Sequence, residues 1–269
     1  MVKFLKLVAA IALTGQVVVA ETPQVLTTAD VVFLGEVHDN PAHHARQAEL
    51  VAELAPQALV FEMLSEAQAL LITPDMMTQP DVLAETVNWA RSGWPDFAMY
   101  APIFAAAPEA AVFGAHVPRD QTRKAAFEGV DAIFPDAARF GLHDPLPEDE
   151  QTQREALQLV AHCNAMPGDM LPVMVDIQRL RDAALARAVY QAISSGATPV
   201  VVITGNGHAR TDWGAPRVLR DVLPDMRIAS LGQGEIGSDV QGTFDVAETT
   251  PGVDREDPCA AFLENRQKN

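Results

Sequence analysis

The chain has 269 residues, a formal net charge of −17 and only two cysteines. A surface with this excess of carboxylates repels the phosphate backbone of nucleic acids and anionic membrane surfaces, so neither is expected as a partner. The length suits one large α/β domain, or one that carries an inserted helical subdomain.

Residues 1–20 have the pattern of a secretory signal peptide. Lys3 and Lys6 precede a short apolar run, and small residues close the segment at Ala20. This order is typical of a cleaved leader, and the apolar run is too short for a transmembrane span. No cysteine lies near the expected cleavage point, so the lipobox of a lipid-anchored protein is missing. We therefore expect cleavage after Ala20, a mature single domain over residues 21–269 without a transmembrane span, and a periplasmic or secreted location.

Two apolar segments end in the same way. VVFLGEVH ends at His38 and VVVITGNGH ends at His208, and each has the composition of a buried parallel strand that stops at a glycine. The next strand-like segment, ALVFEM, places Glu62 at the corresponding position. Because open α/β sheets bind ligands beyond the carboxyl ends of their strands, these side chains are expected to face one site.

The segments between these strands are predicted to be helices. Asn40-Pro41 is a helix start, since asparagine caps well and proline suits the first turn. Residues 64–109 and 119–172 are interpreted as helical cap segments, and an apolar stripe from Ile177 to Ile193 predicts one long helix. The alternation of strand and helix predicts an α/β fold with a central, mainly parallel sheet flanked by helices, plus a helical cap.

The remaining segments are less informative. Residues 110–116 form a further candidate strand that ends at His116, for which a functional and a structural role are equally open. Towards the C-terminus, residues 226–231 are interpreted as a strand. The Gly-rich stretch 232–242 and the segment 244–247 are interpreted as a closing hairpin or edge strands. An oxidising compartment permits Cys163 and Cys259 to pair, and the sequence leaves open whether they do.

A cluster of ionisable groups is predicted at the carboxyl end of the sheet. It consists of Glu36, His38, His44, Glu62 and His208. A carboxylate beside an imidazole can hold a metal that activates water, share a proton, or hold the iron of a porphyrin. His43 is expected to face solvent. The motifs of serine hydrolases, zincins, P-loop proteins and Rossmann enzymes are absent from the sequence, which argues against those classes.

Longer stretches make a family resemblance visible. They are LGEVHDNPAHHARQ at residues 34–47, FEM at 61–63, DIQRLRDAALA at 176–186 and TGNGHARTDWGAP at 204–216. Together they resemble the ChaN family, which belongs to the haem-binding uptake and Tiki superfamily. The resemblance implies an α/β core with a helical cap and an association with haem binding. The paired G-x-x-H motifs that end at His38 and His208 also look like those of metal-dependent Tiki proteases.

Two hypotheses follow from this resemblance, and the first is a periplasmic haem-binding protein in haem or iron uptake. Tyr100 or a histidine at the sheet end would ligate the iron, Trp94 and Phe97 would cover the macrocycle, and Arg179 would meet a propionate. The expected ligand-binding residues are His44, Glu62, Tyr100, Gln178, Arg179 and Asp182. Candidate partners are haem or another small molecule, a haem receptor or uptake protein, and a second copy of the chain in a homodimer.

The second hypothesis is a metal-dependent hydrolase of the Tiki or erythromycin-esterase type. Glu36, His38, Glu62 and His208 would coordinate a divalent ion such as Mn, Zn or Fe, with Glu36, His38 and His208 as catalytic residues. A third alternative is that the polar cluster has no chemical role and that the cap binds a partner protein.

Overall fold

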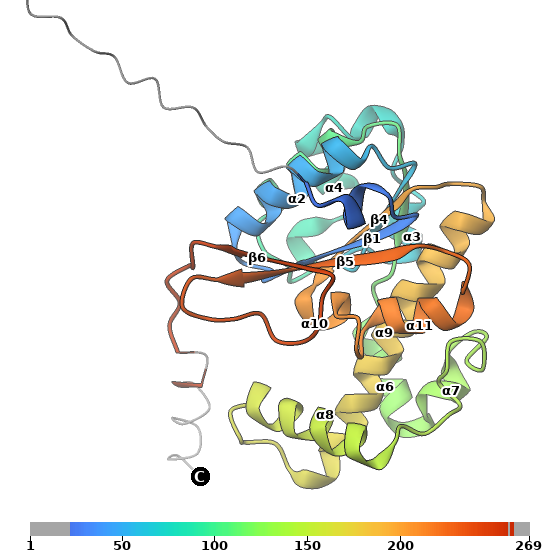
Figure 1. Ribbon diagram of the computed structural model, residues 1–269, viewed down its shortest axis with the longest axis vertical. Coiled ribbons are helices and arrows are strands. Elements are labelled where there is room, and N and C mark those ends of the chain that lie inside the picture. Colours follow the sequence, from blue (N-terminus) through green and yellow to red (C-terminus); the bar gives the residue numbers. More distant parts are fainter. Residues whose placement is uncertain (1–21, 258, 261–269) are drawn as a thin grey trace, which may run out of the picture.

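Figure 1 shows the computed structural model, which describes residues 22–257 and 259–260. The predicted signal peptide, residues 1–20, lies outside the described residues. Six strands form one parallel sheet in the order β3-β2-β4-β1-β5-β6. They are β1 (Val31–Glu36), β2 (Ala58–Phe61), β3 (Ala111–Gly114), β4 (Val200–Gly205), β5 (Ile228–Glu235) and β6 (Val246–Thr250). The predicted α/β class is confirmed.

The central strands are apolar up to their carboxyl ends, and helices cover both of their faces. Along β1, Val32 and Leu34 point into one hydrophobic core, whereas Val31 and Phe33 point into the other. This alternation is the normal geometry of a strand, and burial on both sides explains the continuous run of apolar residues. At the other end of the order, β6 pairs with β5 in parallel as an edge strand, so the alternative of a closing hairpin is wrong.

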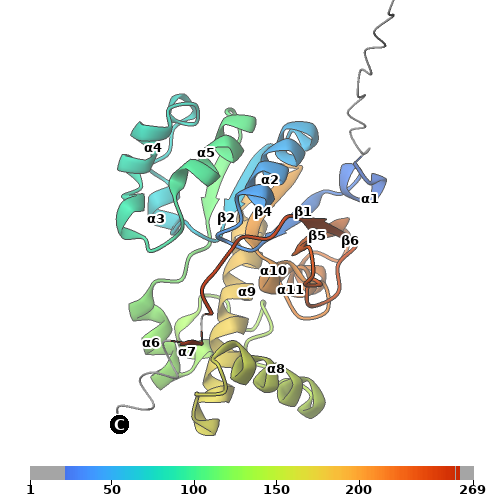
Figure 2. The same cartoon turned by 90° about the vertical axis from the view of Figure 1, so that its left-hand side faces the viewer.

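Helices α2 (Pro41–Leu54) and α5 (Phe97–Ala106) pack on one face of the sheet, and α9 (Leu171–Ser194) and α11 (Ala215–Val222) pack on the other (Figures 1 and 2). The other helices are α1 (Gln24–Thr27), α3 (Glu66–Ala69), α4 (Pro80–Thr86), α6 (Arg119–Glu128), α7 (Val130–Ile133), α8 (Glu148–Ala161) and α10 (Asn206–Ala209). Short 3₁₀ turns lie at Pro74–Met76, Trp89–Arg91 and Gly168–Met170. Within the described part of the chain, every helix is too short or too polar to cross a membrane.

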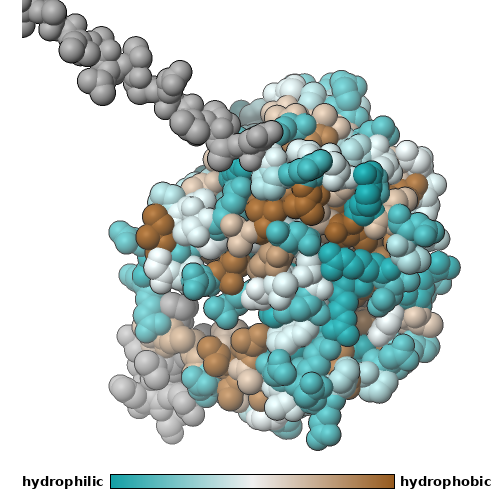
Figure 3. All heavy atoms as spheres, viewed as in Figure 1, coloured by the Kyte–Doolittle hydropathy of each residue, from teal (hydrophilic) through white to brown (hydrophobic). Residues whose placement is uncertain are grey.

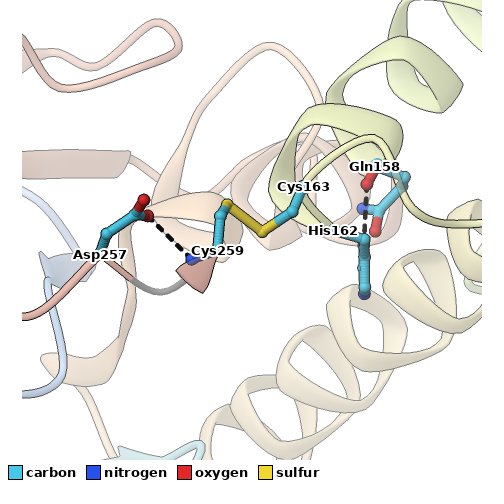
Figure 4. Close-up of a disulfide and its surroundings, with 5 residues drawn as sticks. All are labelled: Gln158, His162, Cys163, Asp257 and Cys259. Atoms are coloured by element: carbon cyan, nitrogen blue, oxygen red, sulfur yellow. Dashed lines mark hydrogen bonds between the residues drawn. A yellow bond between two sulfur atoms is a disulfide. The ribbon is translucent and has the colours of Figure 1, made fainter. Parts of the chain in front are cut away.

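Helices α6, α7 and α8 form an arm around the part of α9 that lies away from the sheet (Figure 2). The chain returns to this arm after β6, and a disulfide joins Cys259 to Cys163 in the turn after α8 (Figure 4). Arg255 fastens the same returning segment at the sheet, because its guanidinium donates to the carboxylates of Asp39 and Glu235. Residues 251–257, which we call the C-terminal strap, are therefore held by Arg255 and, just beyond the strap, by the disulfide of Cys259.

Candidate ligand site at the carboxyl end of the sheet

The turn after β1 is held in shape by the first residues of α2. Asn40 caps this helix, because its Oδ1 accepts a hydrogen bond from the backbone N–H two residues further on. The Nδ1 atom of His43 accepts from the backbone N–H of Val37 at 2.8 Å. The Nε2 atom of His44 donates to the carbonyl of His38 at 2.8 Å. Two consecutive imidazoles thus satisfy backbone groups that the tight turn leaves without partners.

The expectation that His43 faces solvent is wrong, because its side chain is fully buried. Its Nε2 atom reaches the carbonyl of Gly234 on β5 at 3.3 Å. Burial lowers the pKa of His43, so the ring is neutral at neutral pH and acts as one donor and one acceptor. Through His43, the first turn of α2 contacts both the residue that follows β1 and strand β5. The helical spacing in the sequence does not reveal this contact.

Glu36, the last residue of β1, lies at the centre of a buried network. Its Oε1 atom accepts from Nδ1 of His38 at 2.7 Å and from the hydroxyl of Tyr100 at 2.9 Å. Its Oε2 atom lies 3.4 Å from Nδ1 of His44. That separation suits an ion pair, yet neither atom has a hydrogen-bond partner among the described residues. Because His38 donates through Nδ1, its Nε2 atom is left for another partner.

Glu62, directly after β2, joins the ends of two neighbouring strands. Its Oε2 atom accepts from the hydroxyl of Thr204 at 2.7 Å and from the backbone N–H of Gly205 at 2.8 Å. Its Oε1 atom lies 3.8 Å from Nε2 of His208. Burial would raise the pKa of Glu62, but the imidazoles of His208 and His38 and these hydrogen bonds outweigh it and lower the pKa to about 2. Glu62 is therefore a fixed negative charge.

His208 sits in α10, the short helix that follows β4, and is oriented by a carboxylate from α9. Its Nδ1 atom donates to Oδ1 of Asp182 at 2.6 Å, and both side chains are buried. Its Nε2 atom lies 3.5 Å from Nε2 of Gln178. With the proton held on Nδ1, a neutral His208 presents the Nε2 lone pair away from Asp182.

The imidazoles of His38 and His208 and the carboxylates of Glu36 and Glu62 line one cavity of about 500 Å³. Its wall also includes Trp94 from the segment before α5, His116 from the segment after β3, and Gln178 and Arg181 from α9. The ring centroid of Trp94 lies 4.9 Å from that of His38 and 6.0 Å from that of His116. Aromatic, imidazole and guanidinium groups are thus presented to the same space.

The neighbouring carboxylates raise the pKa of two of these imidazoles, those of His38 and His208. Burial alone would lower the pKa of His208, but Glu62 and Asp182 outweigh it and raise the pKa. Burial likewise opposes a charge on His38, and the hydrogen bond to Glu36, with the nearby Glu62, raises its pKa. Both rings therefore carry a proton to higher pH than an exposed histidine does.

His116 behaves in the opposite way. Burial lowers its pKa, and the attraction of Glu62 does not compensate because Arg181 and Arg119 oppose it. The ring is consequently neutral at neutral pH. A neutral imidazole at the wall of a cavity has a nitrogen lone pair that a metal or a hydrogen-bond donor can use.

Glu36, His38, Glu62 and His208 lie together, as the sequence predicts, but they do not converge as ligands of a divalent ion. Oε1 of Glu36 and Oε2 of Glu62 each accept two hydrogen bonds already. Within residues 22–257 and 259–260, no group of three or more His, Cys, Asp or Glu side chains is placed to hold a metal ion. The expected Mn, Zn or Fe centre is therefore not supported.

Four of the six expected ligand-binding residues are absent from the cavity wall, namely His44, Tyr100, Arg179 and Asp182, whereas Glu62 and Gln178 contribute to it. Tyr100 is fully buried in α5, and its hydroxyl is engaged by Glu36. Arg179 donates to the carbonyls of Gly141 and Asp144 at 2.7 and 2.6 Å, which fastens the arm to α9. The expected roles as iron ligand and propionate partner do not fit these positions. Tyr100 instead orients Glu36, and Arg179 supports the fold.

Among the wall residues that the sequence does not assign to the site, His116 and Arg181 are the two with ionisable side chains. His116 follows β3, and only its position after a strand-like segment indicated it. Arg181 was hidden among the charges of the long helix, although it lies three residues after Gln178 and so shares its helix face. Helical spacing from Gln178 would have identified Arg181.

Comparisons with known proteins agree with this architecture. A family model described as haem-binding uptake, Tiki superfamily, ChaN matches residues 23–219, which confirms the resemblance seen in the sequence. A search of curated proteins finds no match. Among solved structures, cofacial heme binding to ChaN of Campylobacter jejuni has a TM-score of 0.63 at 18% identity, covering 82% of this chain and 88% of that one. A mutant erythromycin esterase in its open conformation has a TM-score of 0.43 at 13% identity, covering 78% of this chain and 71% of that one.

Proposed function

Because the chain belongs to the haem-binding uptake ChaN family of the Tiki superfamily, we propose that it binds haem at the carboxyl end of its sheet. The observation that carries the proposal is His116, a neutral imidazole on the wall of the 500 Å³ cavity beside Trp94. Neutral imidazole is a common axial ligand of haem iron. We assign this role to His116 in place of Tyr100.

The rest of the cavity wall fits the same ligand. Trp94 offers an aromatic face for the macrocycle, and Arg181 offers a guanidinium for a propionate. His38, whose pKa is raised, is better suited to an anion than to iron while it holds its proton. Glu62 is a fixed charge that favours the positively charged metal over the carboxylate end of the ligand, which orients haem within the cavity. Bound haem would supply an iron that changes between the ferrous and ferric states.

Haem is in this proposal a cargo rather than a catalyst. The signal-peptide pattern of residues 1–20 supports a periplasmic location, where haem is handled during uptake. The partner would be a haem receptor or another uptake protein. The similar Campylobacter jejuni protein is described with cofacial heme, and two stacked haems shared by a homodimer are part of our proposal for this chain too.

The test is a haem titration followed by the Soret absorbance. We expect saturable binding by the protein and, for His116→Ala, a shifted Soret maximum with an affinity lower by about tenfold or more, since the iron loses its ligand. Arg181→Gln is expected to weaken binding without moving the maximum. His143→Ala is the matched control, because His143 is exposed and remote from the cavity wall.

The outcomes separate the possibilities clearly. An unchanged spectrum and affinity in His116→Ala would reject His116 as the ligand, and loss in His38→Ala alone would transfer the role to that ring. Light scattering with and without haem reports whether the haem-loaded protein is a dimer. A protein that takes up no haem would overturn the proposal altogether.

A second candidate function is hydrolysis by general-base catalysis, and the Asp182–His208 pair favours it. His208 Nε2 would accept a proton from water while the resulting hydroxide attacks the acyl carbon of an ester in the cavity. The acyl–oxygen bond of the ester would then break, and the imidazolium of His208 would return the proton to the departing alcohol. Asp182 holds the ring in the required tautomer and stabilises the imidazolium. This version needs no metal, in keeping with the hydrogen bonds that already occupy the carboxylates.

The second candidate predicts a definite dependence on pH. His208 must lose its proton to act as a base, and its pKa is raised, so the rate of ester hydrolysis should increase as the pH rises above the ordinary histidine range. Asp182→Asn should move this increase to lower pH and reduce the maximal rate. Hydrolysis of a 4-nitrophenyl ester, with and without a chelator, measures both. Activity that a chelator abolishes and manganese restores would contradict the metal-free version, and no activity would remove the candidate.

A further inference from the structure

A second cavity, of about 290 Å³, lies between α8, α9 and the segment that joins α10 to α11. Much of its wall is apolar, formed by Leu157, Val160, Ala161 and Val175. Figure 3 shows hydrophobic side chains gathered at the lower left, over the part of the arm formed by α8, where Leu157 is 40% and Val160 is 65% exposed. Gln178 contributes to this cavity and to the first one. The two cavities are therefore neighbours but have different walls.

The polar part of the second cavity's wall includes Arg154, Arg210 and Asp182, and the carboxylate of Asp182 is already engaged by His208. Arg154 is unusually buried for an arginine, at 8% exposure. One guanidinium nitrogen donates to Glu150 at 2.5 Å and to the carbonyl of Trp213 at 3.3 Å. Its Nε atom has no hydrogen-bond partner among the described residues. A buried donor without a partner is costly, and an acceptor that reaches it gains correspondingly.

A second guanidinium lies against the same aromatic ring but is already used. Arg210 stacks on Trp213, with its Cζ atom 4.0 Å from the ring centroid. It also donates twice to Asp212 at 2.6 Å. Arg154, with its Cζ atom 5.1 Å from the same centroid, is thus the cation of this cavity that has an unused donor.

We propose that this cavity is a second ligand site, separate from the haem site, and that it takes a compact molecule with an apolar body and a carboxylate head. The apolar residues of α8 and α9 would cover the body. The carboxylate would meet Arg154 beside Trp213 and engage the Nε donor. The volume is smaller than that of the first cavity and suits a medium-chain fatty acid or an aromatic acid.

The test compares three eight-carbon probes that share a body and differ in the head: octanoate, octanol and octylamine. Isothermal titration calorimetry on the full chain should show octanoate binding about tenfold more tightly than the other two, as a hydrogen bond to a charged group allows. Arg154→Gln should remove this preference and leave octanol binding unchanged. Arg154→Lys should restore part of it, and Arg123→Gln, which removes an exposed arginine elsewhere, should behave as the unmodified protein.

A filling variant tests the location. Ala161 is exposed at the rim of the cavity, so Ala161→Phe should fold normally, weaken binding of all three probes and leave the haem titration unchanged. The proposal would be overturned if the three probes bind with equal affinity, or if octanoate shows no saturable binding. It would also be overturned if the preference for octanoate survives Arg154→Gln in a folded protein. Circular dichroism establishes that the variants are folded.

Discussion

At the residue scale, Gly205 gives the ring of His38 the space it occupies. A Cβ atom at this position would lie 2.9 Å from Nε2 of His38 and 3.7 Å from Oε2 of Glu62. The backbone φ is −63°, which any residue adopts, so the requirement here is for space and not for conformational freedom. The added Cβ atom would meet the imidazole ring at the end of the His38 side chain, and this ring would have to turn into the cavity.

Gly205→Ala should therefore change the site more than the fold. We expect the affinity for haem to fall by about tenfold, while the free energy of unfolding changes by less than about 1 kcal/mol, because a flexible side chain moves instead of backbone. Haem titration and urea denaturation measure the two effects. Gly168→Ala is the control, since nothing lies within 4 Å of the added atom. Unchanged haem affinity in Gly205→Ala would show that His38 does not help to form the binding site.

The sequence predicts single side chains best at or just after the carboxyl ends of the strands. Glu36, Glu62 and His208 lie together as expected, because parallel strands bring their carboxyl ends to one edge. Tyr100 and Arg179 do not lie at the cavity wall, since the direction of a helical side chain depends on how its helix is rotated against the sheet. The prediction for His43 fails for the same reason, because the packing of α2 buries a polar side chain that was expected to face solvent.

At the element scale, the most reliable predictions rest on local signals. The β-branched runs become β1, β2 and β4, and Asn40 caps α2 as its sequence indicates. The apolar stripe after residue 177 lies in α9, which extends from Leu171 to Ser194. Each of these elements is specified by its own residues, through the spacing of apolar side chains, a helix-capping residue or a residue that ends the element.

Elements that depend on distant partners were predicted less well. β6 has the sequence VAETT, with weak alternation, and it is a strand because β5 offers an open edge for parallel pairing. The position of the strap follows from Arg255 and from Cys259, whose partners are distant in the sequence. No local pattern contains this information, and the domain prediction of cap segments at residues 64–109 and 119–172 remains a prediction.

At the scale of the whole molecule, the disulfide joins two parts of the chain that would otherwise separate. Cys163 and Cys259 are 96 residues apart in sequence, with Cα atoms 5.4 Å apart. A cross-link of this span removes many conformations from the unfolded chain. The bond also keeps the strap beside the arm, so that the sheet and the arm are connected by more than α9 and the loops around it.

The double variant Cys163→Ser, Cys259→Ser should consequently be less stable by up to about 4–5 kcal/mol, because its unfolded state regains these conformations. Urea denaturation of the oxidised protein, the reduced protein and the variant measures the difference. Reductant should lower the stability of the unmodified protein and leave the variant unchanged. Equal unfolding midpoints for all three would contradict the expectation. Arg255→Gln, which removes the ion pairs between the strap and the sheet, should have a smaller effect since exposed ion pairs contribute less than about 1 kcal/mol each.

The position of β1 in the sheet means that the sheet can form only late in the synthesis of the chain. Val31 pairs with Val200 and with Ile228, so the strand nearest the N-terminus waits for partners from the last third of the chain. Contacts between such distant segments form slowly, because the chain must lose the entropy of closing a long loop before any of these contacts stabilises it. The central layer therefore assembles only when almost the whole polypeptide is available, and an emerging chain stays without its sheet until then. A truncated chain that ends before β4 would lack both neighbours of β1 and should not acquire a native sheet at all.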